Sequence, residues 1–113
     1  MGVEDDAKEH GQILVSRSLI LDSRNNCVYT FRSEIIKLTP EEFKTLWHLV
    51  SRENINQSFR KIYKAVWNNG NGKDRRSEAR KTMAYVIEKI NAVGCVVAWI
   101  EYDPSYGYMF RTM

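Results

Sequence analysis

Apolar residues in the second half of the chain recur at the spacing of an α-helix. In the stretch SEARKTMAYVIEKI, residues 77–90, they return every three or four positions, which collects them on one side of a helix that turns about 100° per residue. The side expected to be buried carries Ala79, Met83, Val86, Ile87 and Ile90. Arg80 lies at the flank, and the opposite side carries Ser77, Glu78, Lys81, Ala84, Tyr85 and Glu88. The pattern predicts an amphipathic helix whose outer side either contacts a nucleic acid or is simply solvated.

A second helix is expected to begin in the stretch LTPEEFKTLWHLV. Thr39 is placed to cap it, Pro40 takes the first helical position, and Glu42 completes a capping box. Leu38 and Phe43 stand at the positions of a hydrophobic staple. The apolar stripe that follows has the spacing i, i+3, i+4, i+7 and consists of Phe43, Leu46, Trp47 and Val50.

Between these two helices the pattern predicts a third, capped by Ser58. One side carries the stripe Phe59, Ile62, Tyr63, Val66 and Trp67, and the other carries Arg60, Lys61 and Lys64. Either Asp74 or Ser77 is expected to cap the helix of residues 77–90. Gly94 is expected to follow its end in a left-handed conformation.

Short β-rich runs flank the helices. Residues 13–15, 19–21, 27–31 and 34–37 are separated by turn residues and predict an N-terminal antiparallel meander. Two further runs surround the turn Asp103-Pro104-Ser105 and predict a C-terminal β-hairpin. Strands, three helices and a hairpin, in that order, describe an α+β protein of the winged helix-turn-helix class. We assign residues 13–113 to this domain and residues 1–12 to a flexible acidic lead-in.

Charge is distributed unevenly along the chain. Between Phe59 and Lys89 nine lysines and arginines face three carboxylates, a net +6, whereas the first twelve residues carry a net −3. Such a basic segment suits a polyanionic partner, although a solvated pair of helices would account for it equally well. No apolar run approaches the roughly 18 residues that a membrane span needs. The N-terminus lacks the pattern of a secretory signal, so we expect a cytoplasmic protein.

The sequence offers little that resembles catalytic chemistry. Cys27 and Cys95 lack a CxxC spacing and a nearby histidine, and are expected to be free thiols. His48 is interpreted as a residue at the surface or the edge of the core. The glycines of NNGNGKD follow a helix, whereas a phosphate-binding loop follows a strand. No metal-ligand spacing and no nucleophile beside a base is found, so we expect no cofactor and no enzymatic activity. RNA binding is disfavoured because the aromatic residues lie mostly in helix stripes.

Several motifs resemble the C-terminal DNA-binding domain of OmpR/PhoB-type response regulators, from about Ile13 to Arg111. The strand Leu19-Ile20-Leu21-Asp22 ends in Asp as the family's does. The stretch IIKLTPEEFKTLWHLV is similar to the family pattern i-x-L-T-x-x-E-F-x-L-L-x-x-L. Ser58 with Ile62, Val66 and Trp67 resembles S-R-x-x-L-x-x-x-V-W, and Gly107-Tyr108 resembles the Gly-Tyr of the last strand.

This resemblance implies a sequence-specific transcriptional regulator that binds double-stranded DNA, often as a homodimer on direct repeats. The third helix would lie in the major groove and the hairpin would act as the wing. The family's receiver domain has no counterpart here, which implies an effector domain or a stand-alone relative. The family's loop between second and third helices contacts RNA polymerase, and the matching loop here runs from Asn68 to Asp74. The residues expected to contact DNA are Arg60, Lys61, Arg75, Arg76, Ser77, Arg80, Lys81, Thr82, Ala84, Tyr85, Ser105 and Tyr106.

The chain departs from the family pattern at positions expected to contact DNA. Thr82 stands at the family's histidine, Ile87 at its arginine, and Tyr85 where a further basic residue is common. The wing has Asp103-Pro104-Ser105 where the family usually has an arginine before a glycine. DNA binding with altered specificity is therefore the first hypothesis. The alternative is a protein-interaction module on a winged-helix scaffold with weak or no DNA binding, because exposed Tyr85 suits a protein interface.

Overall fold

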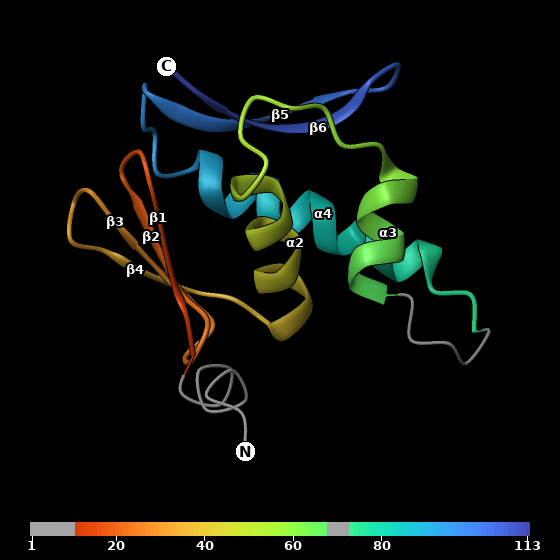
Figure 1. The fold of residues 1–113 in the computed structure, drawn as a ribbon, viewed down its shortest axis with the longest axis horizontal. Coiled ribbons are helices and arrows are strands. Elements are labelled where there is room, and N and C mark those ends of the chain that lie inside the picture. The colour runs from red at the N-terminus through yellow and green to blue at the C-terminus, as the bar shows by residue number, and fades with distance from the viewer. Residues whose placement is uncertain (1–10, 68–72) are drawn as a thin grey trace.

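Four short strands precede the helices and form one antiparallel sheet (Figure 1). The computed structural model describes residues 11–67 and 73–113. The strands are paired in chain order and comprise β1 (Ile13–Ser16), β2 (Leu19–Asp22), β3 (Cys27–Thr30) and β4 (Ile35–Lys37). The expected meander is confirmed. The lead-in predicted over residues 1–12 lies outside the described part of the chain except for Gly11 and Gln12.

The sheet has one buried face and one exposed face, because successive side chains on a strand point to opposite sides. Leu19, Leu21 and Val28 point inward and are buried. Val15 and Ile20, which are paired across β1 and β2, point outward and are exposed. The outer face is therefore unusually apolar for a sheet that faces water on one side.

The three helices that follow the sheet pack against one another. Their bounds are α2 (Pro40–Val50), α3 (Phe59–Trp67) and α4 (Arg76–Asn91). Figure 1 shows α2 in front of α4, with the sheet on one side and α3 on the other. No helix in the described ranges is both long enough and apolar enough to cross a membrane.

The capping box predicted at the start of α2 is confirmed. The Thr39 hydroxyl accepts a hydrogen bond from the Glu42 N–H (3.2 Å), and the Glu42 carboxylate accepts one from the Thr39 N–H (3.0 Å). The same carboxylate is buried and pairs with the Lys89 ammonium at 2.7 Å. One side chain thus closes the first turn of α2 and connects this helix to α4.

The other helix ends agree with expectation except at the start of α4. The Ser58 hydroxyl caps α3 by accepting from the Lys61 N–H (3.1 Å). Gly94 follows α4 with φ +74°. Neither Asp74 nor Ser77 is the N-cap of α4: the N-cap is Arg75, whose side chain forms no capping bond, and Ser77 lies inside the helix. The Asp74 carboxylate nevertheless accepts a hydrogen bond from the first N–H of the helix, that of Arg76, at 3.0 Å.

The C-terminal hairpin is confirmed and consists of β5 (Ala98–Asp103) and β6 (Gly107–Thr112). A segment from the loop after α2 extends this hairpin on the β6 side. The Gln57 N–H donates to the Tyr108 carbonyl (2.7 Å) and the Tyr108 N–H donates to the Gln57 carbonyl (2.8 Å). These bonds attach the hairpin to the chain that leads into α3.

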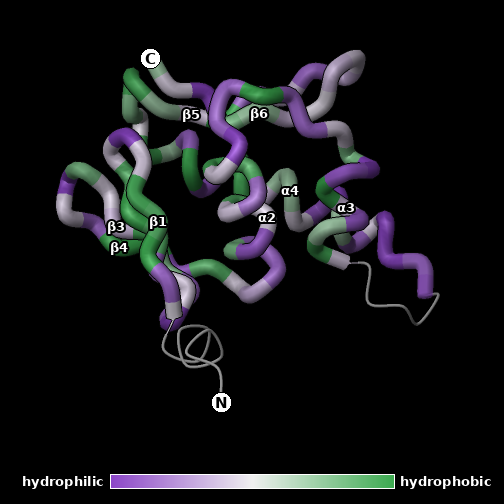
Figure 2. The backbone as a smooth tube through the Cα atoms, viewed as in Figure 1, coloured by the Kyte–Doolittle hydropathy of each residue, from purple (hydrophilic) through white to green (hydrophobic). Residues whose placement is uncertain are grey.

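The core joins all parts of the fold. Its most deeply buried side chains come from the sheet, the three helices and β6, and include Leu21, Val28, Leu46, Leu49, Ile62, Met83, Val86 and Phe110. Figure 2 shows a largely hydrophobic sheet and a hydrophilic chain at the start of α4. Both cysteines are free, as predicted, with Cys27 buried and Cys95 partly buried.

Candidate nucleic-acid interface

Helix α3 separates aromatic side chains from basic ones. Phe59, Tyr63 and Trp67 stack along one side, with ring centroids 5.7 Å and 6.2 Å apart. Arg60, Lys61 and Lys64 are exposed. The aromatic ladder follows from the i, i+4, i+8 spacing of these rings, which places them above one another on a helix.

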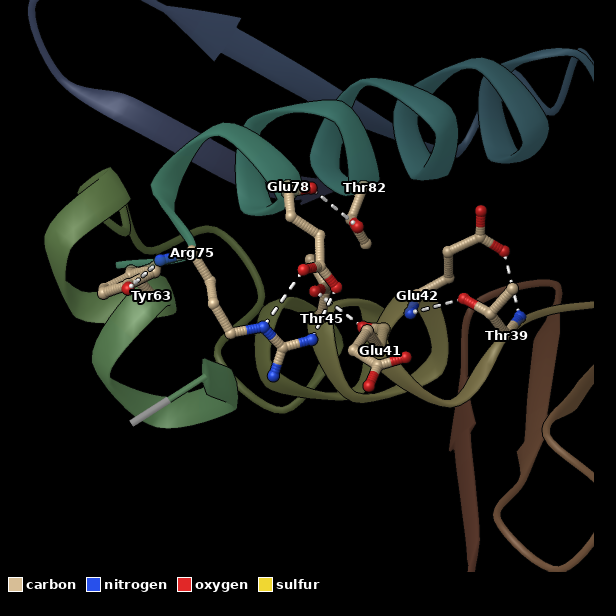
Figure 3. Close-up of polar contacts among 8 residues, drawn as sticks. All are labelled: Thr39, Glu41, Glu42, Thr45, Tyr63, Arg75, Glu78 and Thr82. Atoms are coloured by element: carbon tan, nitrogen blue, oxygen red, sulfur yellow. Dashed lines mark hydrogen bonds and ion pairs between the residues drawn. The ribbon is translucent and has the colours of Figure 1, made fainter. Parts of the chain in front are cut away.

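The aromatic ladder positions the beginning of α4. The Tyr63 hydroxyl accepts a hydrogen bond from the Arg75 N–H at 2.9 Å (Figure 3). One turn farther along, the guanidinium carbon of Arg80 lies 3.9 Å from the centre of the Phe59 ring. This is the geometry of a cation–π contact. Two rings of α3 thereby fix the backbone at the start of α4 and the direction of one of its cationic side chains.

Two arginines at the start of α4 are already paired with carboxylates. Arg76 contacts both oxygens of Asp74 at 3.0 Å and 2.9 Å, and these hydrogen bonds lower the pKa of Asp74 to about 2. Arg75 contacts both oxygens of Glu78 at 3.0 Å and 2.5 Å and lowers the pKa of Glu78. Figure 3 shows the Arg75–Glu78 pair directed toward α2, near Glu41. These two pairs add little net charge to the surface.

Apart from Lys89, which pairs with Glu42, the remaining cations of α3 and α4 give the surface its positive charge. They are exposed, and none forms an ion pair with another residue in the described ranges: Arg60, Lys61, Lys64, Arg80 and Lys81. Lys81 stands on the side of α4 opposite the buried Ala79 and Val86. The sequence-predicted buried side of α4 is correct, with Ile87 only partly buried.

Small and aromatic residues surround Lys81 on the outward side of α4. Ser77 and Ala84 are exposed, and Tyr85 is 53% exposed. Thr82 is partly buried, and its hydroxyl donates to the Glu78 carbonyl at 2.9 Å. A surface with one cation, small side chains and one tyrosine can approach another macromolecule closely.

The wing borders α4 across a cleft of about 260 Å³. Ser105 and Tyr106 form the exposed turn, where the Asp103 carboxylate accepts from the Ser105 N–H at 2.7 Å. Tyr106 is 67% exposed. The residues lining the cleft include Ser58, Phe59, Arg80, Tyr102, Ser105 and Tyr106. The fold thus brings together sequence-predicted residues from α4 and from the wing, which lie about 25 positions apart.

Sequence reasoning missed two residues of this surface. Phe59 was assigned to the apolar stripe of α3, yet its ring supports Arg80. Tyr102 is not among the residues expected to contact DNA, yet it is 51% exposed and lines the cleft while its ring lies 4.7 Å from that of Tyr108. The i, i+4 spacing of the aromatic residues was the signal for the ladder. Nothing in the sequence placed Arg80 above it.

Three further points of the sequence analysis concern the loop from Asn68 to Asp74, the position of His48 and the side chains that could bind a metal ion. The loop from Asn68 to Asp74 lies mostly outside the described residues, so its expected contact with RNA polymerase stays a prediction. His48 is partly buried, and its Nε2 lies 2.8 Å from the Gln57 Oε1. Within residues 11–67 and 73–113, no group of three or more His, Cys, Asp or Glu side chains could hold a metal ion.

Solved structures that share this arrangement of elements include DNA-binding domains. The DNA-binding domain of E. coli CadC has 11% identity and a TM-score of 0.72, covering 93% of this chain and 95% of that chain. The C-terminal domain of the lantibiotic response regulator NsrR has 20% identity and a TM-score of 0.72. The match covers 88% of this chain and 98% of that chain. The DNA-binding domain of Klebsiella pneumoniae RstA, solved in complex with the RstA box, has 21% identity and a TM-score of 0.65. The match covers 88% of this chain and 97% of that chain. No protein-family model matches the sequence, and no curated protein matches it.

The chain has the fold of OmpR/PhoB-type DNA-binding domains. The winged helix-turn-helix class expected from the sequence is confirmed. In this OmpR/PhoB-type fold α2, α3 and α4 form the helical unit, and β5 with β6 forms the wing. The identities are 21% or lower for these three structures, so the likeness establishes the fold, and the function must be argued from the surface.

Proposed function

We propose that the protein is a sequence-specific DNA-binding regulator of transcription. The observation that carries this proposal is the group of exposed cations on α3 and α4 that have no carboxylate partner among the described residues. Lysine and arginine contacts to phosphates supply most of the affinity of proteins for duplex DNA. The charges surround the outward side of α4, which is the side that a helix-turn-helix protein presents to the major groove.

The proposed contacts divide into three groups. Lys81, Ser77, Ala84, Tyr85 and Thr82 lie on or beside the side of α4 that would face base edges, where Tyr85 can contact a thymine methyl group. Arg60, Lys61 and Arg80 would contact phosphates, and Arg75 and Arg76 would add to them where phosphate replaces their carboxylates. Ser105 and Tyr106 would contact the backbone or minor groove from the wing.

Structural neighbours support DNA as the partner. RstA was solved with the RstA box and AdeR with an intercistronic region. By analogy, this chain would act as the effector domain of a response regulator or as a stand-alone relative. Binding as a homodimer, contact with RNA polymerase through the loop from Asn68 to Asp74, and a cytoplasmic location belong to the same proposal.

Selection of bound sequences from a random pool of DNA duplexes tests this function directly. The selected duplex should bind with an affinity that falls steeply as salt rises. Lys81→Glu should weaken binding at least tenfold. Lys37→Glu, on exposed β4 away from α3 and α4, is the matched control and should change binding less than twofold. If no sequence is enriched and no duplex binds at low salt, the proposal is wrong.

The second candidate function is a protein-interaction module on the same scaffold. It is favoured by exposed Tyr85 together with the pairing of Arg75 and Arg76 to carboxylates, which removes two cations from the surface. Aromatic residues are enriched in protein interfaces, and charged ones are depleted at their centres. The salt dependence of DNA binding separates the candidates, because a protein-interaction module would show no steep dependence.

A further inference from the structure

A groove follows the outer side of α2, between the β2–β3 turn and α3. It has a volume of about 560 Å³, within the size range of ligand-binding clefts. Its apolar lining is formed by Phe43, Trp47 and Val66. Figure 1 shows α2 between the sheet and α3.

Trp47 is the most informative residue of the groove. The pattern E-F-x-L-L-x-x-L, which this helix resembles, needs no apolar residue at the position of Trp47. Its ring lies 5.7 Å from that of Phe43 and remains partly exposed. Tryptophan is enriched where a protein buries side chains of a partner. Trp47 packs against the hydrophobic core and also lines the groove, where the exposed part of its ring can contact a partner.

The charges at the rim of the groove are positive. Lys44 and Arg52 line it, and no carboxylate is found among its described lining residues. Neither cation forms an ion pair with another residue of the described ranges. One guanidinium nitrogen of Arg52 donates to the His48 carbonyl at 3.2 Å, which holds this side chain along the last turn of α2.

His48 adds no charge to the groove at neutral pH. Burial lowers its pKa, and the neighbouring charge of Arg52 lowers it further, against a smaller opposing effect of the hydrogen bond to Gln57. The neutral ring is held by that bond at 2.8 Å. The groove therefore combines an aromatic floor with two cations and a fixed neutral imidazole.

The groove and the candidate DNA interface share no lining residue. The surface described above is made by α4, the basic side of α3 and the wing, whereas the groove uses α2, the β2–β3 turn and, on α3, Ala65 and Val66. A molecule in the groove would leave Lys81, Arg80 and Tyr106 exposed. The groove therefore uses none of the α4 and wing residues that are proposed to contact DNA.

We propose that this groove docks an acidic amphipathic helix of a partner protein. Apolar side chains of the helix would pack on Trp47 and Val66, which are partly exposed while Phe43 is buried, and its carboxylates would lie beside Lys44 and Arg52. The charge complementarity of the rim selects an acidic partner. A helix is the conformation that places apolar and acidic side chains on adjacent faces at the i, i+3, i+4 spacing. The assignment is independent of DNA binding.

Peptide binding to the full chain tests the proposal. The probe is a fluorescein-labelled 16-residue helical peptide with Leu and Phe on one face and Glu elsewhere, measured by fluorescence anisotropy. It should bind with a dissociation constant in the micromolar range. A peptide with Lys in place of every Glu, and one with Ala in place of Leu and Phe, should bind at least tenfold more weakly.

Two double variants locate the probe. Lys44→Glu with Arg52→Glu should weaken binding of the acidic peptide at least tenfold. Arg17→Glu with Arg32→Glu, on the turns at the other end of the sheet, is the matched control and should change it less than twofold. Thermal melting of both variants checks that the fold is kept.

Three results would overturn the assignment. Equal binding of the acidic and basic peptides would show that the rim does not select charge. Loss of peptide binding in Lys81→Glu, with no loss in the groove variant, would place the peptide on the DNA interface. Tighter binding after removal of residues 1–10, whose net charge is negative, would make this segment of the chain the occupant in place of a partner.

Discussion

Asp74 determines how much positive charge the start of α4 offers to DNA. Its carboxylate accepts from the Arg76 N–H and from the Arg76 guanidinium, and its pKa is lowered to about 2, so the pair is fully charged at neutral pH. A phosphate that contacts Arg76 must compete with this carboxylate for the positive charge of the guanidinium. Asp74 thus works against the affinity that the arginine would otherwise supply.

Asp74→Asn is expected to increase the affinity for non-specific duplex DNA. The amide oxygen can still accept from the Arg76 N–H, but the negative charge is gone, so Arg76 can neutralise a phosphate. The slope of log affinity against log salt should become steeper by up to about one unit. Anisotropy titrations at several salt concentrations measure it. Asp22→Asn is the control, because it changes a carboxylate at the end of β2 that accepts from the Arg24 N–H. Equal slopes in the unchanged protein, Asp74→Asn and Asp22→Asn would contradict the prediction.

His48 should make the stability of the fold depend on pH. Its pKa in the folded protein is lower than the ordinary value of 6.5, chiefly because of burial. Between these two pKa values the unfolded chain binds more protons than the folded one, so stability falls as pH decreases through this window. Urea unfolding between about pH 7 and about pH 5 should show the loss. His48→Gln should flatten the dependence, and an unchanged slope in this variant would exclude His48 as its source.

At the scale of elements, β2 provides a test of which face of the sheet stabilises the protein. Leu21 is fully buried, whereas its neighbour Ile20 is on the exposed face. Leu21→Ala should lower the free energy of unfolding by about 2–5 kcal/mol because it leaves a cavity. Ile20→Ala should change it by less than about 1 kcal/mol. Urea denaturation measures both, and similar losses would mean that the outer face is covered in solution.

Elements whose signals are local were predicted well. The capping box of α2 is formed by Thr39 and Glu42, three residues apart, so both partners are visible in one stretch of sequence. The buried side of α4 likewise follows from one periodic stretch. The start of α4 was harder to predict from the sequence, because Asp74, Ser77 and Glu78 are all able to interact with its first turn. Tertiary structure decided the outcome, since Tyr63 of α3 accepts from the Arg75 N–H and fixes where the helix begins.

At the scale of the whole molecule, the features missed from sequence join distant segments. Arg80 lies on Phe59, the Lys89 ammonium pairs with Glu42, and Gln57 pairs with Tyr108. No local pattern contains both members of these pairs. Tyr102 was missed for a related reason. It shares a face of β5 with the buried residues Ala98 and Ile100, and its cross-strand partner Tyr108 is buried. Tyr102 is nevertheless exposed, because the Gln57 segment pairs with the hairpin on the β6 side and not on the β5 side.

Gly107 fixes the position of the wing relative to the helices. Its φ is +105°, and a Cβ atom added there would lie 2.4 Å from the Gln57 carbonyl oxygen. That oxygen also accepts from the Tyr108 N–H, so the hairpin cannot move away without losing this bond. A side chain at residue 107 must therefore displace the wing from the segment that leads into α3.

Gly107→Ala is expected to destabilise the fold and to weaken DNA binding. Gly94→Ala is the matched control, because Gly94 also has positive φ, at +74°, but a Cβ atom there would meet nothing within 4 Å. Backbone strain alone should cost the control about 1 kcal/mol of unfolding free energy. Gly107→Ala should lose more, because steric conflict with Gln57 is added to the strain. At temperatures where both variants are folded, only Gly107→Ala should bind the selected duplex more weakly. Equal DNA affinity in the two variants would show that contacts from the wing do not contribute to binding.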